Sequence, residues 1–423
     1  MQELLAIDPV IDALPAGARL VLHSGHAQPA RLAQLVAEHA AELTGVRLLA
    51  TMPMGDAPYA SPDALAHLQV DSFMPGMGLR QAALTAKVGL LRHPVSAWPV
   101  LFERGDLRAD VLMLQVSPPD ANGQVSLGVS VDYMLAALQH ARCVVAEINP
   151  LMPDTCGDSR MDARRIDWFV HATQGPQTAA QATPDEVDQR IACEVAALIN
   201  DEAVIQIGMG SLPEGVLAQL GHLRHLGLHT GIFTDGMRRL IDAGVVDNST
   251  KRFLPGVSVS TMAGGTAELY AFMHHNRAVE MHPCGVTHGA QVLAAMDGFC
   301  AVNSALQVDL HGQVNAEWVG ARRMSLPGGL PDFAAGAMRA KGGQAIIAMR
   351  STYGAERRSS IVAKLADHGP PTLTGGEYHC LVTEYGVAHL HALSVSERAK
   401  AIARVAHPMW RDELMAQAHT IAL

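Results

Sequence analysis

The sequence predicts an α/β protein with two open α/β domains whose sheets are mostly parallel. Short apolar, β-branched runs recur along the 423 residues, and most are followed by Gly or Pro and then by a helical pattern. Strands that alternate with helices in this way form parallel sheets with helices on both faces. The clearest predicted strands cover residues 19–23, 111–116, 143–148, 203–207 and 344–348.

A polar, small-residue stretch at 173–183 interrupts this alternation and has the composition of a linker. The segment 183–186 (Thr-Pro-Asp-Glu) then predicts a helix start, with a capping box and with proline at the first helical position. The predicted buried face of this helix is formed by Val187, Ile191, Val195, Leu198 and Ile199. We therefore expect an N-terminal domain over 1–180 and a C-terminal domain over 181–423.

Composition and charge exclude several classes of protein. With 49% hydrophobic and 17% charged residues, the chain has the composition of a folded globular protein. The net charge is −10 and Lys and Arg are scattered, so we expect no nucleic-acid partner. No apolar run approaches the ~18 residues that span a membrane. Six widely spaced cysteines and a start without a basic, apolar leader predict reduced thiols and a cytoplasmic location.

The segment 206–214 predicts a turn between a strand and a helix. It contains Gln206, Gly208 and Gly210 in the pattern Gln-Ile-Gly-Met-Gly-Ser. Glycines there allow a substrate to approach the backbone, and the free N–H groups of a helix start can hold an anion or an oxyanion. Taken alone, the pattern is also typical of an ordinary tight turn.

A denser glycine cluster covers residues 328–337 and is followed by Lys341-Gly-Gly before a strand. Two glycine pairs that flank an Asp-Phe pair suit a loop around a bulky ligand, and Lys341 could meet a phosphate. A glycine-rich surface connection is the equally simple alternative.

Acid–base and metal-binding groups are present but are individually weak signals. Four carboxylates lie at positions suited to catalysis or to structural hydrogen bonds, namely Glu147, Glu280, Glu317 and Glu384. Three histidines, His222, His225 and His229, have a spacing that could suit a metal, but Gly227 interrupts the helix that would align them. We therefore expect no metal site.

Taken in order, the segments of this chain resemble the acetyl-CoA hydrolase/transferase family, which includes 4-hydroxybutyrate CoA-transferases. The matching stretches run along nearly the whole chain, and a collinear set of this length is specific. They cover residues 115–130, 206–213, 228–236, 302–317, 328–337, 381–386 and 406–408.

The resemblance implies two open α/β domains of the class I CoA-transferase type, with the active site in the cleft between them. It implies coenzyme A as part of an acyl-CoA substrate, a small carboxylate as second substrate, and a homodimer or higher homo-oligomer. Gln206 and Gly208 match positions around the thioester oxygen. The family's CoA-facing loop is matched by Gly328, Gly329, Asp332, Phe333 and Gly336.

Three departures from the family pattern concern the chemistry itself. Gly231 stands where the family has the nucleophilic glutamate that forms an acyl-glutamyl anhydride and then a glutamyl-CoA thioester. His288 stands at the position of an active-site asparagine. Leu326 and Pro327 replace part of a flexible glycine run before Gly328.

A glycine at 231 cannot serve the covalent route, which needs a carboxylate at the thioester carbonyl. Three hypotheses remain open from the sequence. The first is non-covalent hydrolase, lyase or decarboxylase chemistry on an acyl-CoA, with Gln206 and Gly208 at the oxyanion and His288 as base. The second is CoA transfer through a different carboxylate, Glu280 or Glu317. The third is a paralogue that binds a CoA thioester without turnover.

Overall fold

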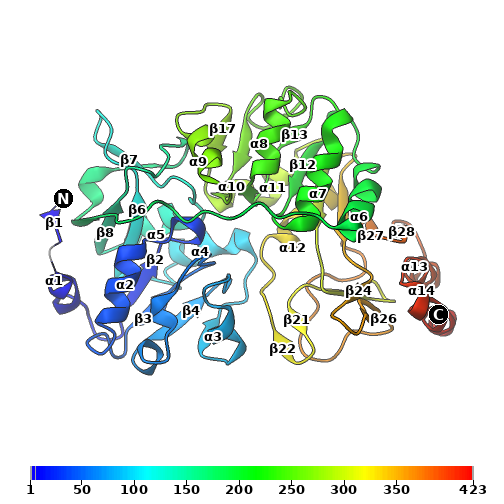
Figure 1. Cartoon of the computed structure of the whole chain (residues 1–423), viewed down its shortest axis with the longest axis horizontal. Helices are drawn as coiled ribbons and strands as arrows, with labels where there is room; N and C mark the ends of the chain where they lie inside the picture. Colours follow the sequence, from blue (N-terminus) through cyan, green and yellow to red (C-terminus); the bar gives the residue numbers. More distant parts are fainter. Residues whose placement is uncertain (1, 5, 422–423) are drawn as a thin grey trace.

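The computed structural model describes residues 2–4 and 6–421, which fold around two large sheets (Figure 1). The first sheet has eight strands, and all neighbours in it are parallel. In spatial order its strands are β1 (Gln2–Glu3), β11 (Trp168–His171), β8 (Cys143–Ile148), β6 (Val111–Val116), β2 (Arg19–Leu22), β3 (Arg47–Leu49), β4 (Gln69–Ser72) and β5 (Val88–Leu90).

The second sheet has six strands, and only its last pair is antiparallel. Its spatial order is β13 (Gly227–Leu228), β12 (Val204–Ile207), β18 (Phe299–Asn303), β23 (Gln344–Ala348), β27 (Cys380–Thr383) and β28 (Gly386–His389). The predicted fold class is therefore confirmed. The predicted strands at 111–116, 143–148 and 344–348 match β6, β8 and β23 in full, and those at 19–23 and 203–207 match β2 and β12 to within one residue.

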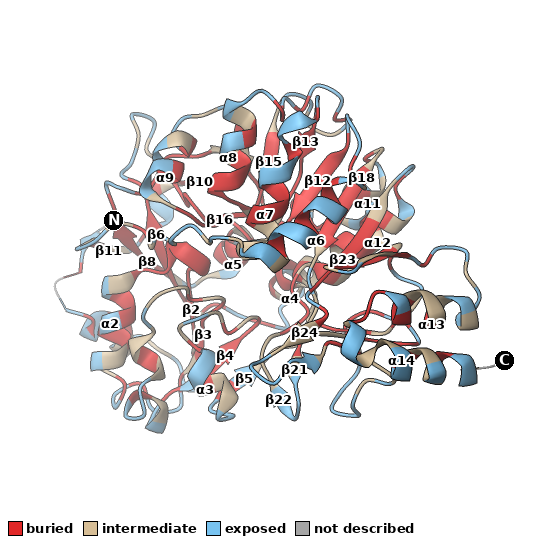
Figure 2. Ribbon diagram, turned by 45° about the vertical axis from the view of Figure 1, so that its right-hand side comes forward, coloured by how far each residue is buried: buried red, intermediate tan, exposed pale blue. Residues whose placement is uncertain are grey.

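Helices lie between the strands in sequence and cover the sheets, whose strands are mostly buried (Figure 2). Those of the N-terminal half are α1 (Asp8–Asp12), α2 (Ala30–Glu38), α3 (Arg80–Leu84), α4 (Trp98–Glu103) and α5 (Met134–His140). Those of the C-terminal half are α6 (Glu186–Ala196), α7 (Ser211–Gln219), α8 (Asp235–Asp242), α9 (Ala267–Met273), α10 (Cys284–Thr287), α11 (Ala290–Ala294), α12 (Leu330–Arg339), α13 (Val395–Arg404) and α14 (Pro408–Thr420).

The predicted start of the helix after the linker was wrong by two residues. Helix α6 begins at Glu186, and its N-cap is Asp185, whose carboxylate accepts hydrogen bonds from the N–H groups of Val187 and Asp188. Arg350 donates to the same carboxylate at 2.9 Å, which holds it at the cap. A carboxylate at the helix N-terminus is also favoured by the helix dipole, so the cap forms at Asp185 instead of Thr183.

The linker runs from one half of the molecule to the other in Figure 1, and each large sheet is built from one side of it. This partition supports the predicted boundary at 180/181, which stays a prediction. The halves are joined by side-chain packing, because one hydrophobic cluster contains both Val21 of β2 and Val382 of β27. Strand pairing also joins the two halves. The short strand β9 (Cys156–Gly157) of the N-terminal half pairs with β17 (Val279–Met281) of the C-terminal half.

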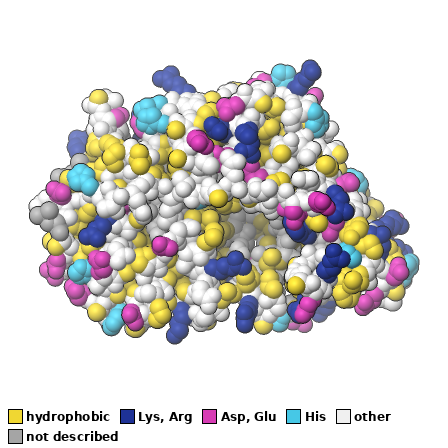
Figure 3. Space-filling model, viewed as in Figure 1, with side chains coloured by type: hydrophobic (Ala, Val, Ile, Leu, Met, Phe, Trp, Pro, Cys, Tyr) yellow, Lys and Arg dark blue, Asp and Glu magenta, His cyan; other side chains and the backbone are white. Residues whose placement is uncertain are grey.

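Two further properties concern the whole described chain. All six cysteines are free thiols. Within residues 2–4 and 6–421, no helix combines the length and the apolar character needed to cross a bilayer. Figure 3 shows a hollow between the two halves, with hydrophobic side chains inside it and Lys or Arg side chains at its rim.

Candidate active site

The Gln206 turn lies at the carboxyl end of β12, as the sequence predicted. Gln206 is buried, and its Oε1 accepts a hydrogen bond of 3.0 Å from Nδ2 of Asn303 at the end of the neighbouring strand β18. Gly210 has φ +125° and precedes the first residue of α7. A Cβ added at Gly208 would have no neighbour within 4 Å. The turn therefore leaves open space beside Gly208, at an edge of the sheet where ligands bind in open α/β folds.

His288 lies directly beside Gly231. A Cβ added to Gly231 would be 3.1 Å from Nε2 of His288 and 3.3 Å from a ring carbon of Phe333. The two rings pack against each other with centroids 4.4 Å apart. A Cβ added to Gly329 would be 2.7 Å from the same Nε2. The imidazole thus fills space that a side chain at position 231 or 329 would need.

The protonation state of His288 is set by burial. The side chain is 3% exposed, and desolvation lowers its pKa to about 3. Its Nδ1 lies 2.9 Å from Oγ1 of Thr287, so the direction of that hydrogen bond determines which tautomer is present. Burial also lowers the pKa of His229, whose Nε2 lies 2.9 Å from the carbonyl oxygen of Thr287. Both rings are neutral at pH 7.

The segment 328–336 contacts the protein itself at every position expected to face CoA. A Cβ at Gly328 would be 2.8 Å from the methyl carbon of Met74, and a Cβ at Gly336 would be 2.5 Å from Cβ of Leu293 on α11. The carboxylate of Asp332 accepts hydrogen bonds from Ser96 in the N-terminal half, at 3.1 Å from its N–H and 2.6 Å from its O–H. Burial raises the pKa of Asp332 to about 6.

Lys341 is not brought together with the other predicted residues. It lies in the connection before β23, and its carbonyl oxygen accepts a hydrogen bond from the N–H of Gly298, which precedes β18. Lys341 is therefore at the amino end of these parallel strands, whereas Gln206 and Asn303 are at the carboxyl end. Its side chain is exposed.

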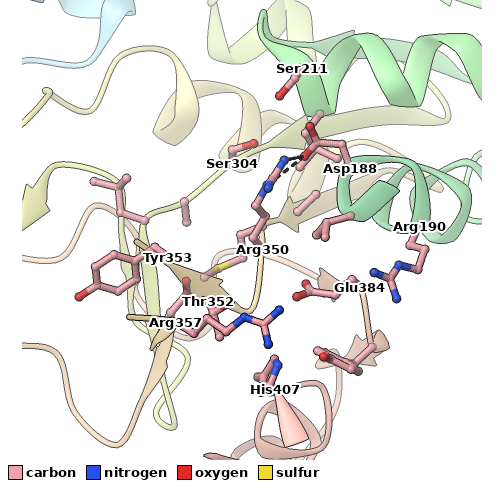
Figure 4. A pocket seen from close by; sticks show the side chains of 18 of the residues that line it. Asp188, Arg190, Ser211, Ser304, Arg350, Thr352, Tyr353, Arg357, Glu384 and His407 are labelled. Atoms are coloured by element: carbon pink, nitrogen blue, oxygen red, sulfur yellow. Dashed lines mark hydrogen bonds and ion pairs between the residues drawn. The ribbon is translucent and has the colours of Figure 1, made fainter. Parts of the chain in front are cut away.

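A cleft of about 600 Å³ opens at the carboxyl end of the six-stranded sheet and was not predicted from the sequence. Ser211 at the start of α7 and Ser304 after β18 line it, which places it next to the Gln206 turn. Figure 4 shows the guanidinium of Arg350 reaching Asp188, and other charged or polar side chains of the same cleft. These include Arg190, Arg357, Glu384 and His407.

The other carboxylates named from the sequence all have partners. The fully buried Glu317 accepts two hydrogen bonds from Arg92, at 2.9 and 2.8 Å, and one from Thr372. Glu280 lies 2.8 Å from Nε2 of His282. Glu147 accepts from backbone N–H groups at the start of α2, and burial raises its pKa to about 7. Glu384 accepts from the N–H and O–H groups of Ser351.

The histidine trio has three separate environments. His222 contacts the carbonyl oxygen of Gln219, His225 forms an ion pair with Asp247, and His229 is buried against Thr287. Across the part of the chain that the structure describes, no group of three or more His, Cys, Asp or Glu side chains is arranged to hold a metal.

Comparison with solved structures first defines the class of protein. The fold matches RipA from Yersinia pestis with a TM-score of 0.91 at 28% identity, covering 99% of this chain and 97% of that chain. It matches 4-hydroxybutyrate CoA-transferase from Porphyromonas gingivalis with a TM-score of 0.84 at 30% identity and the same coverage. The architecture is therefore that of a CoA-transferase.

The family follows from the sequence comparisons. Residues 4–178 match the acetyl-CoA hydrolase/transferase N-terminal domain, and residues 265–418 match the C-terminal domain of the same family. The chain is 33% identical over 414 residues to 4-hydroxybutyrate coenzyme A transferase of Clostridium kluyveri, covering 98% of this chain and 96% of that protein. The chain belongs to the acetyl-CoA hydrolase/transferase family, which acts on acyl-CoA thioesters.

Proposed function

We propose that this protein hydrolyses an acyl-CoA thioester with a water molecule activated by His288, without a glutamyl-CoA intermediate. The observation that carries the proposal is the 3.1 Å between Nε2 of His288 and the Cβ position of residue 231. The resemblance assigns the nucleophilic carboxylate to residue 231. A basic nitrogen thus lies beside the point from which the missing nucleophile would extend.

The neutral imidazole can offer a lone pair at Nε2 to a proton. In the proposed tautomer Nδ1–H donates to Oγ1 of Thr287, which leaves the lone pair of Nε2 free. Water attacks the thioester carbon and gives its proton to Nε2. When the C–S bond breaks, the imidazolium returns that proton to the CoA sulfur, which yields free CoA and a carboxylic acid. A pKa of about 3 makes Nε2 a weak base for the first transfer and the imidazolium a strong acid for the second.

The oxyanion and the CoA group are assigned to the neighbouring features. The open turn at Gly208 presents backbone near Gln206, and preorganised donors of this kind contribute roughly 3–4 kcal/mol each to a transition state. The 600 Å³ cleft next to that turn contains Arg190 and Arg357, which suit the phosphates of CoA. Asp332, Gly336 and Lys341 have no part in this assignment, because their contacts are elsewhere.

Transfer through another carboxylate receives less support from the contacts. Glu317 is fully buried and bound by Arg92, and Glu280 is bound by His282. A nucleophilic carboxylate would have to give up these partners. Homo-oligomeric assembly and a cytoplasmic location stay predictions.

The test is consumption of acetyl-CoA and butyryl-CoA with and without added acetate, for the wild type and for His288→Asn and His288→Ala. We expect consumption without acceptor, and a loss of ~10²–10⁴ in rate for both variants. Gly221→Ala is the control, since a Cβ there meets no atom within 4 Å and the backbone is not in the left-handed region.

The remaining outcomes each contradict a part of the proposal. Near-native turnover by His288→Asn would make the histidine structural. Strict dependence on acetate, with a borohydride-trapped adduct on Glu280 or Glu317, would establish CoA transfer. CoA-thioester binding by the wild type without any turnover would show a non-catalytic paralogue.

A further inference from the structure

Three methionines lie around the thioester end of the candidate site. Met52 and Met74 follow the carboxyl ends of the neighbouring parallel strands β3 and β4 in the N-terminal half, and Met262 begins β16 (Met262–Ala263). Met52 and Met74 are partly exposed, whereas Met262 is buried. None of the three was singled out by its sequence motif.

The first contacts connect Gly231 to the N-terminal half. The N–H of Met262 donates to the carbonyl oxygen of Gly231 at 3.1 Å. The methyl carbon of Met262 lies 2.5 Å from the Cβ position of Gly25, and that of Met52 lies 3.8 Å from it. Gly25 follows β2 and has φ +60°, so a side chain is disfavoured there by conformation as well as by space.

The second set of contacts leads back to His288. The N–H of Met52 donates to the carbonyl oxygen of Met74 at 2.6 Å. The methyl carbon of Met74 lies 2.8 Å from the Cβ position of Gly328, and the adjacent Gly329 contacts His288. Neighbouring residues therefore form a ring that runs from Gly231 through Met262, Gly25, Met52, Met74 and the glycines at 328 and 329 to His288.

The charges around this ring are unfavourable for a second carboxylate on the substrate. Behind Gly25, the fully buried Asp132 is hydrogen-bonded to Ser24, whose hydroxyl also contacts Ser130. Burial raises the pKa of Asp132 to about 6, which still leaves it mostly ionised at pH 7. Arg92, a cation close in sequence to Met74, is already paired with Glu317.

We propose that Met52, Met74 and Met262 form the wall of the acyl pocket and select the short, uncharged aliphatic chain of a monocarboxylic acyl-CoA over the CoA thioester of a dicarboxylic acid. The assignment rests on the proposed function, because it takes Gly231 and His288 as the reacting end. Thioether sulfurs and methyl groups adapt to an apolar chain. A terminal carboxylate would lose its hydration against them.

Binding of two thioether analogues, which cannot be hydrolysed, tests the inference independently of turnover. Calorimetry compares S-butyl-CoA with S-(3-carboxypropyl)-CoA on the wild type at low ionic strength. We expect S-butyl-CoA to bind at least ~100-fold more tightly. Met74→Ala and, independently, Met52→Ala should weaken S-butyl-CoA by ~10-fold or more while the affinity for free CoA is kept. Met77→Ala is the matched control, because that side chain is 70% exposed three residues from Met74.

Equal affinity for the two analogues would overturn the inference. So would methionine variants, shown to be folded, that bind S-butyl-CoA and free CoA unchanged. If instead the binding preference holds while His288 variants keep full turnover, the hydrolytic mechanism fails and the acyl selectivity stands.

Discussion

Two glycine-rich segments border the candidate site, and the space left by their missing side chains is used differently. At Gly208 no atom lies within 4 Å of the Cβ position. At Gly328, Gly329 and Gly336 the same position is 2.8, 2.7 and 2.5 Å from side chains of the protein itself. The first segment offers space to a ligand, and the second is filled by the protein's own residues.

This difference has a consequence for catalysis. Because Gly329 makes room for His288, the second segment sets the position of the histidine that the proposed function uses as base. Asp332 in turn fixes the start of α12 to Ser96 of the N-terminal half. Glycines that look alike in sequence therefore leave open space in one segment and make room for a histidine in the other.

The largest effect that would test this comparison is expected for Gly329→Ala. Gly329 has φ −85°, which alanine also adopts, so the cost arises from contact alone. The new Cβ would lie 2.7 Å from Nε2 of His288 and 2.8 Å from Phe333, and one of the rings must move. We expect hydrolysis of acetyl-CoA to fall by ~10²–10⁴, as for loss of the base itself. Steady-state kinetics measures this, with circular dichroism and CoA affinity as checks on folding.

A folded Gly329→Ala protein with wild-type turnover would contradict the placement of His288 in the reaction.

A smaller effect, of a different kind, is expected for Gly208→Ala. No atom is close to the new Cβ, so the free energy of unfolding should stay the same or rise by ~0.4–1 kcal/mol through a less flexible unfolded chain. Affinity for acyl-CoA should fall by about tenfold, because the methyl group enters the space that the proposed function assigns to the thioester. Urea unfolding and calorimetric titration measure the two quantities.

Gly336→Ala is the contrasting control. Its Cβ meets Leu293 at 2.5 Å, so it should lose ~1–3 kcal/mol of stability and keep its affinity. If Gly208→Ala instead lost stability and kept its affinity, the distinction between the two segments would fail.

Much of the fold could be predicted because parallel strands buried on both faces read as apolar runs, as in β6, all of whose residues are buried. The Gln206 turn was predicted for the same reason, since it directly follows such a run. Its partner Asn303 was not, because the pair depends on the register of β12 against β18.

The second glycine segment shows where sequence reasoning ends. A glycine in sequence does not show which atom fills the space of its missing Cβ, and Met74, His288 and Leu293 are all distant in the chain. Lys341 lies away from Gln206 for a simpler reason, because a residue just before a parallel strand lies at the amino edge of the sheet. The capping of α6 by Asp185 depended on Arg350, which is likewise remote in sequence.

The smallest effect concerns the anchor of the second segment and appears in the pH dependence of stability. The pKa of Asp332 in the folded protein, about 6, lies above the ordinary value of 3.8, so the folded state holds this proton more tightly than the unfolded chain. The contribution of Asp332 to the free energy of unfolding is therefore full below pH ~4, falls as the pH rises towards 6, and is lost above it. Asp332→Asn should remove this dependence, so that its stability relative to the wild type rises by about 1 kcal/mol between pH 5 and pH 7.

Ser96→Ala should have the opposite effect, since loss of the hydroxyl donor raises the pKa of Asp332 further. Other buried acids such as Asp132 and Glu147 titrate in all three proteins and cancel in the comparison. Urea unfolding curves at pH 5, 6 and 7 measure the differences, and parallel pH profiles for the wild type and Asp332→Asn would show that Asp332 does not anchor the segment as a buried carboxylate.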